Sequence, residues 1–290
     1  MFTPDSPAAI AKVQPRCRRD RHSTTELIKQ AQKYSPVLAR GYSSGNIAIV
    51  DKRSWLEVCD RKHRYGANLR AYFKAWKRQD EPKPDFWEWL NDETVEVEGV
   101  PRAKLEKETV VYYDKTQRTQ FEVAFRYGLL HVASTQELID TGDDGWIFVL
   151  RDGVLYATAK VTKQTPRIHH TSFVGGECVQ TAGIIVVAQG VLTTIYPHSG
   201  HYRPSESEVL VLLRFLHQHG VRLQDVAVDV QRFQKVSRER THVAKVSKME
   251  NAYFWPAPDV LLFLEAKEKA WGGTLFDDIE MAAKSRPGAV

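Results

Sequence analysis

The residues best suited to chemistry lie in one segment of the chain, residues 168–204. This segment holds four of the ten histidines of the protein, and hydroxyl side chains accompany them. Imidazole and hydroxyl groups are common general bases, nucleophiles and metal ligands in protein sites. The candidate pocket residues are His169, His170, Thr171, Ser172, Ser199, His201 and Tyr202.

Three interpretations of this segment are open. In the first, the histidines are structural and bond to the backbone in tight turns. In the second, they line a small-molecule or catalytic pocket. Residues 168–173 are predicted to form a strand, in which neighbouring side chains point to opposite faces. Only one of His169 and His170 would therefore line a given pocket.

The third interpretation is a metal site. His198 and His201 are three residues apart, and with His169 or His170 they could offer neutral imidazoles to zinc. No aspartate, glutamate or cysteine stands at ligand spacing to complete this set. The sequence therefore predicts no metal and no cofactor.

The elements that must position this segment begin with helices. Helical spacing of apolar residues predicts a short helix from Trp55 and a second one after Gly66. Asp85 is expected to cap a third helix, and Pro101 is expected to open a fourth. This part of the chain is predicted to form a helical layer.

After residue 109 the apolar pattern changes to a period of two, which indicates strands. The predicted strands are residues 110–113, 121–127, 146–151, 154–161, 168–173, 184–187, 191–196 and 226–230. Asp152-Gly153 and Gln189-Gly190 are typical of tight hairpin turns. Ser205 and Glu208 form a capping box for a helix that ends at Gly220. The predicted fold is α+β, with a helical N-terminal layer packed on an antiparallel, hairpin-rich sheet.

The composition of the 290-residue chain is that of an ordinary globular protein, with 42% hydrophobic and 27% charged residues. The net charge of +5 permits an acidic partner without requiring one. The three cysteines offer neither a disulfide framework nor a paired metal motif, which favours a reducing compartment. We find no signal peptide and no membrane span, and therefore expect a soluble protein without a membrane or specific nucleic-acid partner.

The chain is expected to have three regions. Residues 1–45 are predicted to be a basic, loosely ordered arm, because they are polar and lack apolar periodicity. Residues 46–231 form the predicted α+β core domain. Residues 232–290 are predicted to be a charged segment with short helices near 263–269 and 275–281.

Three segments, in this order and spacing, resemble one protein family. They are Arg61-Lys-His-Arg-Tyr-Gly-Ala-Asn-Leu69 with Phe86–Leu90; Pro101–Leu105 with 110–113 and Gly145–Val149; and Ile168–Phe173 with Ser199-Gly-His-Tyr-Arg-Pro204. Over about residues 61–230, the chain is similar to the IQ-motif-containing (IQM) proteins. The resemblance implies calmodulin binding through an IQ motif near the N-terminus, a cytoplasmic and nuclear location, and roles in signalling and stress response.

The best candidate for the IQ motif is degenerate. An IQ motif is a helix that presents an aliphatic-Gln pair and basic residues to a calmodulin lobe. Arg19 stands where glycine is usual, and Pro15 disfavours a helical conformation at Gln14. The candidate calmodulin-binding residues are Val13, Gln14, Arg18 and Arg19. A calmodulin-linked signalling or interaction protein without demonstrated catalysis is the primary prediction, and a solvated basic arm is the alternative reading of this segment.

A second resemblance gives an alternative function. A His-Thr pair followed later by a tyrosine is similar to the pattern of ADP-ribosyltransferases, which use NAD. This resemblance implies a transferase pocket within residues 168–204, with His169 or His170 on the ribose and Tyr202 stacked on the nicotinamide. Glu206 or Glu208 would then be the catalytic acid, although Glu208 is also expected to cap a helix.

Overall fold

The computed structural model describes residues 48, 50, 54–231, 233, 242–243 and 253–270. The α-helices are α4 (Trp55–Cys59), α5 (Gly66–Lys77), α6 (Phe86–Asn91), α7 (Arg102–Lys107), α8 (Glu206–Gln218) and α9 (Ala257–Ala270). The short 3-10 helices are η2 (Gln117–Phe121), η3 (His170–Phe173) and η4 (Leu223–Asp225). None of the described helices is long and apolar enough to cross a membrane. The predicted arm and its candidate calmodulin-binding residues lie outside the described residues.

The strands form one large sheet and one small one. They are β1 (Val123–Arg126), β2 (Leu129–Val132), β3 (Trp146–Arg151), β4 (Val154–Thr158), β5 (Thr181–Ala188), β6 (Val191–Tyr196), β7 (Ala227–Asp229), β8 (His242–Val243) and β9 (Tyr253–Pro256). The large sheet has the order β4-β3-β5-β6-β7-β9-β8, and β1 pairs with β2. The predicted α+β class with a hairpin-rich, mainly antiparallel sheet is confirmed.

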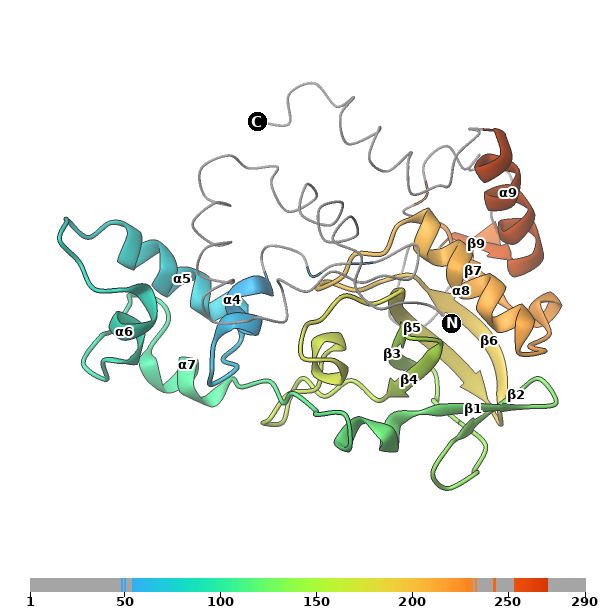
Figure 1. The fold of residues 1–290 in the computed structure, drawn as a ribbon, viewed down its shortest axis with the longest axis horizontal. Coiled ribbons are helices and arrows are strands. Elements are labelled where there is room, and N and C mark those ends of the chain that lie inside the picture. The colour runs from blue at the N-terminus through green and yellow to red at the C-terminus, as the bar shows by residue number, and fades with distance from the viewer. Residues whose placement is uncertain are drawn as a thin grey trace, which may run out of the picture.

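The helices lie on both sides of the large sheet (Figure 1). Helices α4–α7 lie at one end of the molecule, and α8 and α9 lie at the other. Alternate residues of β3 point to opposite faces of the sheet. Ile147 and Val149 pack with α4–α7, whereas Phe148 and Leu150 pack with α8 and α9. The period of two that predicted this strand thus reflects two hydrophobic cores that share one sheet.

The buried residues of the helical layer are those whose helical spacing predicted the helices. In α5, Leu69, Tyr72, Phe73 and Trp76 are all buried on the face that packs against the rest of the layer. The Oδ1 atom of Asp85 accepts a hydrogen bond from the backbone N–H of Trp87 at 3.0 Å, so the predicted cap of α6 is confirmed.

Helix α8 lies between β6 and β7 in the chain. These two strands make the one parallel pairing among the described strands. Glu208 accepts a bond from the backbone N–H of Ser205 at 2.7 Å, and the two side chains are also bonded, which confirms the predicted capping box. The helix ends before Gly220, whose φ of 77° is in the left-handed region. The chain then enters β7 parallel to β6, as a helical crossover allows.

The described part of the predicted C-terminal segment joins both the sheet and the core. Strand β9 pairs antiparallel with β7, and α9 begins earlier than predicted, at Ala257. Val260 and Leu264 are fully buried against the core that contains α8. The predicted helix at 275–281 lies outside the described residues, and the boundary at residue 232 stays a prediction.

Two predicted strands are wrong. Instead, residues 170–173 form a turn of 3-10 helix, and Ile168 makes only an isolated bridge with Val161. Ser172 holds this turn through two bonds to the backbone of His169: its Oγ accepts from His169 N–H at 2.9 Å, and its own N–H donates to His169 O at 3.0 Å. Residues 110–113 make only an isolated bridge, between Val110 and Arg167, and single bonds to neighbouring loops. The histidine segment therefore enters the site from a turn.

Candidate functional site

A polar pocket of about 330 Å³ lies where α4 and α5 meet the histidine-rich loops. One carboxylate, from Glu57, and three histidines, His169, His170 and His201, line it, together with four longer cationic side chains. Those cations are Arg70, Lys160, Arg167 and Arg203. The pocket therefore brings a buried acid and three imidazoles together beneath a basic rim.

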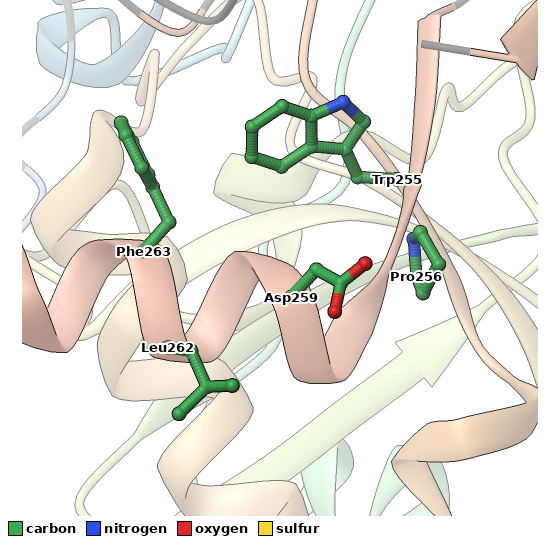
Figure 2. A pocket seen from close by; sticks show the side chains of 5 residues that line it. All are labelled: Trp255, Pro256, Asp259, Leu262 and Phe263. Atoms are coloured by element: carbon green, nitrogen blue, oxygen red, sulfur yellow. The ribbon is translucent and has the colours of Figure 1, made fainter. Parts of the chain in front are cut away.

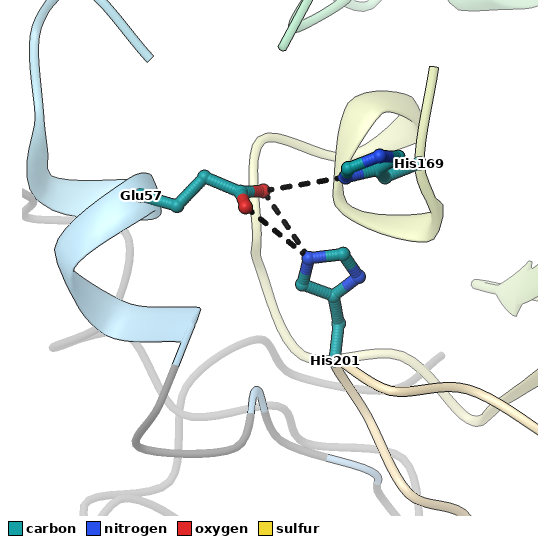
Figure 3. Close-up of side chains that lie close together, drawn as sticks. All are labelled: Glu57, His169 and His201. Atoms are coloured by element: carbon teal, nitrogen blue, oxygen red, sulfur yellow. Dashed lines mark hydrogen bonds and ion pairs between the residues drawn. The ribbon is translucent and has the colours of Figure 1, made fainter. Parts of the chain in front are cut away.

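Glu57 is the centre of this arrangement (Figure 3). Its carboxylate is almost fully buried and lies 3.3 Å from Nε2 of His201 and 3.9 Å from Nδ1 of His169. The Thr171 hydroxyl donates a hydrogen bond to Oε1 at 3.0 Å. Burial alone would raise the pKa of Glu57, but the two histidines outweigh it and hold the pKa far below its ordinary value. Glu57 is therefore an anion in the folded protein.

His169 stands at the start of η3, with its ring edge-on to that of Tyr65 at 5.3 Å. Its Nδ1 is buried, faces Glu57 and has no hydrogen-bond partner among the described residues. Burial lowers the pKa of His169, and the neighbouring Glu57 only partly offsets this. The ring is therefore neutral near pH 7, which leaves a nitrogen lone pair available.

His201 comes from the loop between β6 and α8. The loop is held by Ser199, whose Oγ accepts a bond from the backbone N–H of Tyr202 at 3.1 Å. The rings of His169 and His201 have their centres 5.1 Å apart. Of the predicted pocket residues, the structure therefore brings His169, Thr171 and His201 together around Glu57, and His170 also lines the pocket.

The remaining predicted pocket residues have structural contacts. His170 is buried and its Nε2 lies 2.9 Å from Gly183 O; burial lowers the pKa of His170 to about 3. Tyr202 is buried, and its hydroxyl donates to Glu177 O at 2.8 Å. Ser172 and Ser199 bond the backbone. These contacts match the structural interpretation for this part of the segment.

His198 lies apart from the cluster. Its Nε2 is 2.9 Å from Oδ2 of Asp229, a fully buried residue of β7. The predicted combination of His198 with His201 therefore does not form, because the two side chains have different carboxylate partners.

Sequence reasoning missed Glu57. It lies 114 residues before Thr171 and 144 before His201, so no local spacing signals the contact. The one available sign is its position in a short helix with an apolar inward face, where Trp55, Leu56 and Val58 are buried beside it. A glutamate on such a face needs a partner, but the sequence does not say which one.

The transferase alternative receives no support from this geometry. Tyr202 is enclosed and hydrogen-bonded, so its ring is not free to stack on a nicotinamide. Glu208 is buried in the capping box of α8. Neither lines the pocket that contains His169 and His201.

A second hollow, of about 420 Å³, lies at the junction of β9 and α9 (Figure 2). Trp255, Pro256, Asp259, Leu262 and Phe263 line it. The rings of Trp255 and Phe263 meet edge to face at 5.7 Å. With one acid and otherwise apolar side chains, this hollow offers little for chemistry compared with the Glu57 pocket.

Comparison with known proteins shows which protein family the chain is similar to. Residues 117–209 match the IQ motif-containing protein middle domain. The IQ domain-containing proteins IQM2 and IQM3 of Arabidopsis thaliana are 32% and 35% identical to the chain, over 77% and 63% of its length. The chain belongs to the IQM family. It spans about two fifths of these relatives, 38% and 42% of their lengths.

The matched IQM middle domain runs from η2 into α8 and so contains His169, Thr171 and His201. Glu57 lies outside it, on the helical layer. The site therefore joins the IQM middle domain to the helices that precede it. No solved structure matches the chain.

Proposed function

We propose that this IQM protein is a calmodulin-linked signalling or interaction protein, with residues Val13 to Arg19 as its calmodulin-binding segment. One observation carries the proposal: the chain is similar, through most of its length, to proteins described as IQ domain-containing. The arm supplies the required chemistry, because an aliphatic-Gln pair is followed by a cluster of arginines. Arginine side chains suit the acidic surface of a calmodulin lobe.

The proposal includes a location in the cytoplasm or nucleus and a role in stress signalling. The three cysteines lie far apart in the sequence and offer no disulfide framework, which is in keeping with a reducing compartment. In this proposal the folded body is an interaction platform, and no catalytic step is assigned to it.

Titration calorimetry with calmodulin tests the proposal. The full chain is compared, with and without calcium, with a chain that begins at Ser44. A double variant, Gln14→Ala with Arg18→Glu, is expected to bind about 10- to 100-fold more weakly, because it loses one hydrogen bond and reverses one charge contact. Truncation is expected to abolish binding.

The matched control is Gln30→Ala with Arg40→Glu, which makes the same chemical changes elsewhere in the arm. It is expected to bind as the unmodified chain does. Binding that survives truncation would show that the arm is not the site. Absence of binding by the full chain in both calcium conditions would overturn the proposal.

A further inference from the structure

We propose that Glu57, His169 and His201 form a binding site for one divalent first-row transition-metal ion of the Zn²⁺ class. Each residue offers one ligand atom, and the three atoms lie within 4.8 Å of one another. The distances from the Glu57 carboxylate to the imidazole nitrogens, 3.3 and 3.9 Å, are close to the roughly 3–3.5 Å that ligands about 2.0–2.2 Å from a shared ion would have.

The donor set selects the class of ion. Two imidazole nitrogens and one carboxylate oxygen suit zinc, iron, cobalt or nickel. Calcium and magnesium prefer oxygen ligands throughout and are poorly served by two imidazoles. The same combination of two histidines and one glutamate holds zinc in known catalytic sites that leave one position open.

Hydrogen bonding within the cluster leaves one group unsatisfied, and this favours an ion. Nδ1 of His169 is buried and faces Glu57, yet 3.9 Å is too long for a hydrogen bond. A buried polar atom without a partner destabilises the folded state. An ion between the three side chains would satisfy this nitrogen and neutralise the buried carboxylate of Glu57.

The surroundings hold the carboxylate in place, as an outer shell does in metal sites. The Thr171 hydroxyl donates to Oε1 of Glu57 at 3.0 Å, and the backbone N–H of Gly66 lies 3.5 Å from Oε2. Outer contacts of this kind orient ligands and typically change metal affinity about 10- to 100-fold. Glu57 therefore has little freedom to turn away from the two rings.

The cluster is open on its pocket side. No fourth His, Cys, Asp or Glu joins the three within the described part of the chain. A bound ion would keep at least one coordination position toward the pocket, for water or for an anionic group drawn there by the basic rim around Arg70 and Lys160. Open positions distinguish reactive metal sites from closed structural ones.

Cobalt substitution tests the site directly. The untagged full chain, freed of metal with a chelator that is then removed, is titrated with Co²⁺ and followed by visible absorption. Zinc is then added to displace the cobalt, and bound zinc is counted by mass spectrometry of the metal. We expect one ion per chain, a visible band that zinc abolishes, and a zinc-dependent rise in melting temperature.

Variants distinguish this site from adventitious binding. His201→Asn and Glu57→Gln each remove a ligand and are expected to weaken zinc binding by at least about 100-fold. Thr171→Val removes an outer contact and is expected to weaken binding by about 10-fold. His198→Asn is the matched control, since His198 is a histidine of the same loop that faces Asp229 instead; it is expected to bind zinc normally.

Circular dichroism of the metal-free variants checks that each one folds. If Glu57→Gln does not fold, the His201→Asn variant tests the proposal instead. The side chain of His201 is partly exposed, so its replacement is better tolerated by the fold. Less than one tightly bound ion per chain, unchanged affinity in folded His201→Asn, or equal loss in His198→Asn would overturn the proposal. The outcome is independent of calmodulin binding, which is assigned to the arm.

Discussion

Arg64 shows how much a single residue organises the helical layer. Its side chain is fully buried and binds Asp60 through two nitrogens, at 2.8 and 2.9 Å. It also contacts Glu106 at 3.1 Å and Asn91 at 3.1 Å. The guanidinium fork suits this arrangement because it presents several donors in one plane. One side chain thereby connects the end of α4 to α6 and α7.

We predict that Arg64→Met lowers the free energy of unfolding by about 3–5 kcal/mol, because it removes the guanidinium that pairs with the buried carboxylate of Asp60. Urea denaturation measures the change. Arg222→Met is the matched control: Arg222 pairs with Asp225 but is 80% exposed, so its loss should change stability by less than about 1 kcal/mol. Equal effects of the two substitutions would contradict the assigned role of Arg64.

At this scale, the sequence shows the chemistry of a side chain but not the contacts that it makes. His169, Thr171 and His201 were chosen for their side-chain chemistry, and they do meet. His170 and Tyr202 were chosen on the same grounds, but His170 contacts the backbone at Gly183 and Tyr202 packs in the core. Side-chain chemistry is visible in a sequence, whereas the direction in which a side chain points depends on the backbone, here a 3-10 turn in place of the expected strand.

Among the elements, those defined by local rules were predicted well. The hairpin turn at Asp152-Gly153 has positive φ at both residues, 53° and 73°, as a tight turn between twisted strands requires. Gln189-Gly190 is similar, with 46° and 80°. Helix α8 begins at its capping box. These features depend on a few adjacent residues, which is why their positions can be read along the chain.

The cap of α8 gives a prediction for a single element. Ser205→Ala removes the hydroxyl that bonds Glu208 at the start of the helix, and is expected to lower the free energy of unfolding by about 0.5–2 kcal/mol. Ser205→Thr keeps a hydroxyl and is expected to retain most of the stability. Thermal unfolding of both variants, followed by circular dichroism, provides the measurement. A larger loss in the threonine variant would argue against the capping role.

The whole molecule is organised by one sheet with a hydrophobic core on each face. This arrangement could not be predicted, because strand order depends on pairings between distant segments. Strand β7 pairs with both β6 and β9, so it lies between residues 253–256 and the hairpin strands β5 and β6. The period of two predicted which strands exist, but not which core each face would join.

Because both cores share the sheet, we predict that they unfold together. Leu264→Ala in α9 removes a fully buried side chain and should lower the free energy of unfolding by about 2–5 kcal/mol. Tryptophan fluorescence, to which the four tryptophans of α4–α6 contribute, should change at the same urea concentration as circular dichroism. Leu262→Ala, in the same helix but 66% exposed, is the control and should have little effect. Two separate transitions would contradict a shared sheet.

The distance along the chain between Glu57 and its partners sets the time at which the cluster can form. Closing loops of 114 and 144 residues carries an entropic penalty of about 4 kcal/mol from chain length alone, so these contacts form only after shorter-range structure has brought the ends together. During synthesis, the cluster cannot be complete until His201 has left the ribosome. An intact Glu57 cluster is therefore a late marker of folding, present only in chains whose helical layer has already docked onto the sheet.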